Sequence, residues 1–171
     1  YFRERFPDKR YDCFTNGIDD AFLQAPPLES VRPTHERKQV LYAGNIGEGQ
    51  GLHRVLPELA RRCADRFEFL VVGDGGRRAA LEAALMESGV DNVTISAPVS
   101  RAELIALYEA ADVLFLHLNA YPAFLKVLPS KLFEYGALGK PVLAGVGGYA
   151  REFIETEVNG AAVFSPCDAQ A

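Results

Sequence analysis

Residues 129–148 read PSKLFEYGALGKPVLAGVGG and hold a helix, a strand and a glycine turn in one run. The helix is expected to begin at Ser130, a favoured N-cap residue type, and to end at Gly139, which tolerates the left-handed conformation of a helix end. An apolar strand follows directly, and a Gly-Gly pair closes the stretch. A helix that leads into a short apolar strand is the repeating unit of a parallel α/β sheet.

The same alternation of apolar strand, glycine turn and amphipathic helix continues along the chain. Apolar runs predict strands at 40–43, 67–72, 92–96, 112–116, 141–144 and 161–164. Helical spacing predicts helices at 52–64, at 77–88, after the capping-box pair Ser100 and Glu103, and near 149–156. Strands separated by crossover helices predict an α/β fold, a Rossmann-like α/β/α sandwich with a mostly parallel sheet.

The composition is that of one globular domain. The 171 residues are 49% hydrophobic, which is enough for a core, and no run of 18 apolar residues could span a membrane. The net charge of −5 argues against a nucleic-acid-binding surface. Cys13, Cys63 and Cys167 are far apart and lack metal-ligand spacing. We therefore expect reduced thiols, no metal site and a cytoplasmic protein.

The first part of the chain departs from the α/β alternation. We expect residues 1–37 to form a lead-in that consists of a helix end, a strand and a polar, proline-bearing surface connection. Residues 38–171 then form the domain. The chain lacks an initiator methionine and begins inside what reads as a helix end. We therefore expect a domain excised from a longer protein.

The helix after Pro129 carries charges that its own stability does not require. Lys131 lies in the first turn, where a cation opposes the helix dipole, and Phe133 stands where a capping box needs Glu or Gln. A bound anion would reverse the cost of Lys131, and Glu134 could hold hydroxyl groups of the same ligand. This pattern indicates a phosphate joined to a sugar. A solvated Lys131–Glu134 pair is the alternative reading.

Ligands of open parallel sheets bind at the carboxyl ends of the strands, so the loops at those ends are the candidate site. The loop 44–51, GNIGEGQG, is rich in glycine, which allows a close approach to phosphate; a flexible turn is the alternative. It matches neither a Walker loop nor a dinucleotide fingerprint. The loop that opens at Gly73 is the weaker candidate. His117 also lies at a strand end, but no hydrolase triad or nucleophile elbow accompanies it.

Motifs in a fixed order carry a family resemblance: 16–19 NGID, 71–75 VVGDG, 111–113 ADV, Glu134 before 139–142 GKPV, and 147–148 GG before Glu152. In this order they resemble the C-terminal, donor-binding domain of retaining GT-B glycosyltransferases of family four. The sequence at 129–135 is most similar to that of the N-acetyl amino-sugar transferases, of N-acetylfucosamine type, of bacterial surface-polysaccharide clusters.

The resemblance implies a domain that binds a nucleotide sugar, usually UDP-linked, without metal or cofactor. It implies a missing N-terminal domain for a glycan or lipid-linked acceptor, which in relatives lies at the inner face of the cytoplasmic membrane. The fragment alone should then be inactive, with peripheral membrane contact only in the full-length enzyme. The implied donor-binding residues are Glu134 for the ribose, Val99 for the base, and Ser130, Lys131, Asn45, Gly47, Glu48, Gly49 and Gln50 around the diphosphate. Gly73 is a further nucleotide-sugar-binding candidate.

Three departures from the family pattern affect this implied site. The first motif glutamate falls on Lys126, and two usual phosphate-binding cations fall on Asn45 and Gln50. We hypothesise that Lys131, together with Lys126, compensates; these two lysines are the catalytic candidates. Two other functions stay open: half of a sugar-nucleotide 2-epimerase, and a non-catalytic nucleotide-sugar-binding module whose missing cations record lost donor binding.

Overall fold

A computed structural model describes residues 2–12, 17–23 and 37–170 of the chain. The domain is built on six strands that are all parallel and lie in the order β3-β2-β1-β4-β5-β6. The strands are β1 (Lys38–Ala43), β2 (Phe67–Val72), β3 (Val93–Ser96), β4 (Val113–His117), β5 (Val142–Gly145) and β6 (Ala161–Phe164). The predicted α/β fold and all six predicted strands are confirmed.

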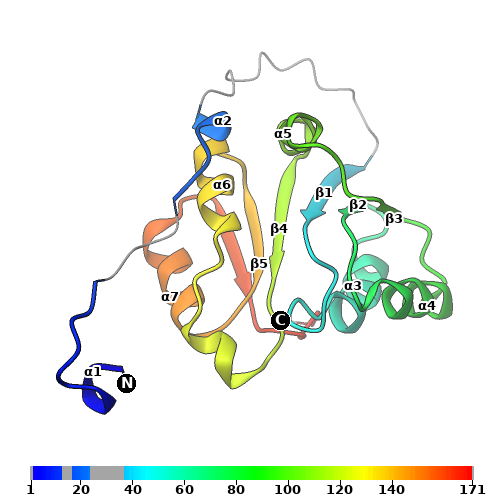
Figure 1. The fold of residues 1–171 in the computed structure, drawn as a ribbon. Helices are drawn as coiled ribbons and strands as arrows, with labels where there is room; N and C mark the ends of the chain where they lie inside the picture. Colours follow the sequence, from blue (N-terminus) through cyan, green and yellow to red (C-terminus); the bar gives the residue numbers. More distant parts are fainter. Residues whose placement is uncertain (1, 13–16, 24–36, 171) are drawn as a thin grey trace.

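Crossover helices connect the strands and pack on both faces of the sheet (Figure 1). They are α3 (Leu52–Arg62), α4 (Arg78–Ser88), α5 (Arg101–Ala110), α6 (Lys131–Leu138) and α7 (Gly148–Glu157). Strand residues alternate between two apolar clusters. Leu41 packs with α5, α6 and α7, whereas its neighbours Val40 and Tyr42 pack with α3 and α4. The order reverses beside β1, between β1 and β4, which is where ligands of such sheets bind.

Local signals set most helix ends as predicted, with one exception. Ser100 and Glu103 form a complete capping box at the start of α5, and Gly139 ends α6 with a φ of 61°. Ser130 is not the side-chain cap that we expected, because its own backbone is already helical and its side chain makes no cap hydrogen bond. Instead, Leu132 N donates to Pro129 O at 3.1 Å, and the helix begins at Lys131.

The lead-in departs from its prediction at residues 20–23. Its described parts contain α1 (Phe2–Arg5) and α2 (Asp20–Leu23) and no strand; residues 13–16 and 24–36 lie outside the described residues. Residues 20–23 are not a plain polar connection, because Phe22 is fully buried against α5 and α6. The connection after β4 contains the 3₁₀ helix η1 (Pro122–Lys126).

An apolar groove of about 430 Å³ lies beside α3, on the side of the sheet that α3 covers only in part. Its lining comes from α3 and from five strands or their entry residues: Val40, Leu59, Cys63, Phe67, Phe69, Val113, Pro141, Val142, Leu143, Gly160, Ala161 and Ala162. None of the helices in the described ranges is both long and apolar enough to cross a bilayer.

Candidate functional site

A cavity of about 290 Å³ lies at the carboxyl ends of β1 and β2. It is lined by Ala43, Gly44, Asn45, Val72, Gly73, Asp74, Pro98, Val99, Leu104 and Lys131. Strand ends, the β3–α5 loop, α5 and the start of α6 thus meet at one place. Four of the residues predicted from the sequence line this cavity together: Asn45, Gly73, Val99 and Lys131.

Two glycines give the cavity its floor, because the backbones of β1 and β2 approach each other closely there. A Cβ at Gly73 would lie 1.9 Å from the carbonyl oxygen of Gly44, and the φ of Gly73 is +154°. A Cβ at Gly44 would lie 2.7 Å from Cε of Lys131. The absence of a side chain at Gly44 therefore makes room for the Lys131 side chain over the end of β1.

The Lys131 ammonium has no ion-pair partner within the described part of the chain, so the predicted alternative, a Lys131–Glu134 pair, does not form. Burial lowers the pKa of Lys131, the nearby Glu134 charge opposes this, and Arg101 adds to the lowering. The ammonium also sits at the positive end of α6. A cation without a partner beside a helix N-terminus is a site for an anion.

Glu134 lies one turn behind Lys131 on α6 and is held from α5. The hydroxyl of Tyr108 donates a hydrogen bond to Oε2 of Glu134 at 3.3 Å. Glu134 is half-buried and is not among the residues that line the cavity. Ser130 and Lys126 are exposed and also lie outside the cavity lining.

In the glycine loop, the polar side chains at the two departure positions face each other. Asn45 Nδ2 donates to Gln50 Oε1 at 2.9 Å, and the hydroxyl of Tyr42 donates to the carbonyl of Asn45 at 2.6 Å. The positions that carry phosphate-binding cations in the resembling family therefore form a neutral amide pair. The cavity receives Gly44 and Asn45 from this loop, whereas Gly47, Glu48, Gly49 and Gln50 lie outside its lining.

The Glu48 carboxylate is used inside the protein. Its Oε1 accepts a hydrogen bond from the Tyr121 hydroxyl at 2.6 Å, and its Oε2 pairs with Nε of Arg77 at 2.5 Å. The hydrogen bond from Tyr121, followed by the charge of Arg77, lowers the pKa of Glu48. Because both oxygens have partners, Glu48 supports the loop and does not offer a free charge to a diphosphate.

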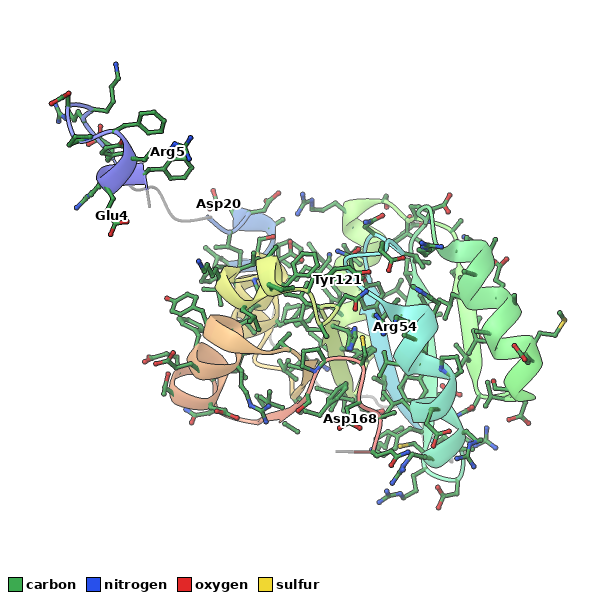
Figure 2. The ribbon with its side chains drawn as sticks, turned by 90° about the horizontal axis from the view of Figure 1, so that it is seen from below. Glu4, Arg5, Asp20, Arg54, Tyr121 and Asp168 are labelled. Atoms are coloured by element: carbon green, nitrogen blue, oxygen red, sulfur yellow. The ribbon has the colours of Figure 1, made fainter. Side chains whose placement is uncertain are left out.

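The segment 117–124 holds the glycine loop along its length. Asn119 Nδ2 donates to the carbonyl of Glu48 at 2.9 Å, and Asn119 N donates to the carbonyl of Gly49 at 2.8 Å. The ring of Phe124 packs on Gly49, where a Cβ would lie 2.8 Å from it. Figure 2 shows Tyr121 and Arg54 beside each other, where the two segments meet. Sequence reasoning missed these contacts, since they join positions far apart in the chain.

His117, which the sequence suggested as a candidate, has a structural role. It is fully buried, its Nδ1 lies 2.5 Å from the carbonyl of Gln50, and its Nε2 accepts a hydrogen bond from Cys167 N. This pattern defines a neutral ring with the proton on Nδ1. Burial lowers the pKa of His117 to about 4. The ring ties the glycine loop to the end of the chain and has no free nitrogen for catalysis.

Comparison with known proteins identifies the family. The model of the family described as "Glycosyl transferases group 1" matches residues 28–171. The chain belongs to this family. Its fold also matches GT-B glycosyltransferase structures. The group 1 domain described here contains the whole parallel sheet and the cavity.

Two curated relatives resemble the group 1 domain. WcaI of Escherichia coli K12, named as a glycosyl transferase of colanic acid biosynthesis, is 37% identical over 103 residues, which is 60% of this chain and 25% of the relative. A 2-deoxystreptamine glucosyltransferase of Streptomyces kanamyceticus is 32% identical over 149 residues, which is 80% of this chain and 37% of the relative. The chain thus spans between a quarter and two fifths of the curated relatives it matches.

Solved structures of glycosyltransferases share the fold. Anabaena Alr3699/HepE, crystallised with UDP and glucose, superposes with a TM-score of 0.60 at 25% identity over 79% of this chain and 36% of that chain. WaaG, a glycosyltransferase of lipopolysaccharide biosynthesis, superposes with a TM-score of 0.58 at 25% identity over 77% of this chain and 34% of that chain. Both solved chains are about three times as long as the part that this chain covers.

Proposed function

We propose that this domain binds a nucleotide sugar, most simply a UDP-sugar, as the donor half of a retaining glycosyltransferase. The observation that carries the proposal is the Lys131 ammonium, which lies over Gly44 at the N-terminus of α6 with no partner of its own within the described residues. The UDP-bound neighbour Alr3699/HepE supports the choice of donor.

In this proposal the diphosphate lies between Gly44 and the start of α6, and no metal or cofactor takes part. The amides of Leu132 and Phe133 donate to the carbonyls of Pro129 and Ser130. The amides of Ser130 and Lys131 would then be the ones that face the anion. Together with Lys131 they would stabilise the negative charge on the departing diphosphate. Val99 would contact the base, and Glu134 would accept hydrogen bonds from the ribose hydroxyls.

The wider reaction belongs to the same proposal. A separate acceptor domain would present a polysaccharide or a lipid-linked sugar to the donor, and the 171 residues alone would not transfer sugar. The colanic acid relative WcaI supports a role in bacterial polysaccharide synthesis, and an N-acetyl amino sugar is the proposed donor sugar. The proposed location is the cytoplasm, at the inner face of the membrane.

One observation favours a second candidate, a non-catalytic binding module. The neutral Asn45–Gln50 pair leaves Lys131 as the cation in the cavity lining. If this single cation were too weak, donor binding would be lost. The two candidates predict opposite results in the same binding experiment.

That experiment is a titration of the chain with UDP, GDP, CMP and their sugar conjugates, followed by calorimetry. We expect selective binding of uridine diphosphates. Saturating ligand should also raise the melting temperature, because a ligand at 100 times its Kd adds about 2.7 kcal/mol to the free energy of unfolding. Millimolar UDP without heat or stabilisation would contradict the proposal and favour the non-catalytic module. Sugar transfer by the isolated chain would contradict the need for an acceptor domain.

A further inference from the structure

We infer that Tyr108 is a positioning residue, which holds the carboxylate of Glu134 in place for the ribose of the donor. The inference rests on the proposed function for the identity of the ligand. It concerns a residue that has no contact with the cavity itself and that no motif in the sequence singles out.

The two side chains meet directly behind the cavity wall. Leu104 and Lys131 line the cavity from α5 and α6. Tyr108 lies one turn after Leu104, and Glu134 lies one turn after Lys131, so each follows its neighbour on the same helix face. The hydroxyl of Tyr108 then reaches Oε2 of Glu134 at 3.3 Å. The bond therefore links α5 and α6 one helical turn beyond the residues with which these helices line the cavity.

Tyr108 itself is held firmly. It is fully buried, with its ring edge-to-face against Tyr135 at 5.4 Å and tilted against Phe22 at 6.1 Å. Burial, and then the charge of Glu134, raises the pKa of Tyr108, so its hydroxyl remains a donor across the physiological range. Since Phe22 comes from α2, the lead-in helix also supports this side chain.

The effect on Glu134 is to select one conformation. In the described residues, no hydrogen bond or ion pair other than that from Tyr108 reaches the Glu134 carboxylate. One carboxylate oxygen is thereby held, and the other is left to accept hydrogen bonds from a ligand. A carboxylate fixed before binding loses less side-chain entropy when the ribose arrives. Tyr108 thus contributes to affinity without touching the donor.

The test removes only the hydroxyl. We expect Tyr108→Phe to weaken UDP binding by about two- to tenfold, the size of one hydrogen bond, when measured by calorimetry. The affinity for 2′,3′-dideoxy-UDP, which lacks the ribose hydroxyls, should be the same for Tyr108→Phe as for the wild type. In a Glu134→Ala background, the same substitution should have no further effect on UDP. A merely structural role would weaken both nucleotides and would persist without Glu134; either result would overturn the inference.

A second measurement needs no ligand. In crystal structures of the wild-type chain and of Tyr108→Phe, we expect Glu134 to be well ordered in the former and to occupy several conformers in the latter. An unchanged, ordered Glu134 in Tyr108→Phe would overturn the positioning role whatever the binding data. If the wild-type protein fails to bind UDP but Glu134 loses its order in Tyr108→Phe, the proposed donor is wrong and the positioning role of Tyr108 stands.

Discussion

Replacing Lys131 by methionine tests the proposed anion site most directly. Methionine keeps a long unbranched side chain over Gly44, so the packing at the end of β1 changes little, but the charge is lost. The expected result is weaker binding of UDP with a fold that melts at nearly the same temperature. The matched control is Lys9→Met, which removes one positive charge from the lead-in.

The magnitude follows from the position of the ammonium. Two unit charges 4 Å apart interact by about 1 kcal/mol in water and about 4 kcal/mol at an effective dielectric constant of 20. Lys131 is half-buried, so an intermediate value of about 2 kcal/mol applies. This corresponds to a loss of about 30-fold in UDP affinity. The neutral Asn45–Gln50 pair cannot replace the lost charge.

The pH dependence gives an independent check with a defined sign. Because burial lowers the pKa of Lys131, its charge is lost at a lower pH than that of an exposed lysine. UDP affinity should therefore be retained below this lowered pKa and should fall as the pH rises through it. Lys131→Arg should remove the fall, since arginine stays charged.

A Kd for Lys131→Met within twofold of the wild-type value, in titration calorimetry, would refute the reasoning.

Three further substitutions probe the supports of the site. Gly73→Ala would place a Cβ 1.9 Å from the carbonyl oxygen of Gly44; we expect a loss of about 2 kcal/mol or more, read as a fall of at least about 4 °C in calorimetric Tm, and an unchanged Tm would contradict the close approach. His117 is neutral in the fold with a pKa of about 4, so stability should fall by at most about 1.4 kcal/mol per pH unit as the pH drops from about 6.5 to 4. Urea titrations at several pH values should show that the stability of His117→Gln falls less steeply with decreasing pH than that of the wild type. An equally steep fall would rule out His117 as the cause of the pH dependence. Tyr121→Phe frees Glu48 from its hydroxyl partner, so amide exchange in the glycine loop should accelerate while Tm changes little. Unaltered exchange would contradict the role of the Tyr121–Glu48 hydrogen bond in holding the loop.

The strands, and most helix ends, follow from short-range patterns and could be predicted. Residues 161–164 are a short apolar run, AAVF, and form β6 with the predicted bounds. Ser100 and Glu103 are three positions apart and form their capping box in isolation from the rest of the fold. The cluster of Asn45, Gly73, Val99 and Lys131 was also predictable, because parallel strands end at one edge and bring their loops together.

The supports of the site have no such local signal. Tyr121 and Glu48 are 73 positions apart, and nothing near either residue indicates the other. Phe22 and Leu23 are adjacent apolar residues, yet Phe22 is buried and Leu23 is exposed, and only the packing of α2 on α6 explains which of the two is buried. Ser130 failed as a cap because the turn at Pro129 already places it in helical conformation. These contacts depend on tertiary packing, which sequence propensity does not contain.

The apolar groove beside α3 has a practical bearing on the melting experiments. Environment-sensitive dyes report unfolding by entering exposed apolar surface, and the groove of about 430 Å³ offers such a surface before any heat is applied. The folded chain should therefore be bright at the start of a dye-based melt, and ligand-induced shifts would be hard to read. The sequence contains no tryptophan to provide a dye-free optical signal of that kind. Circular dichroism at the helix band, or calorimetry, is the suitable way to follow its unfolding.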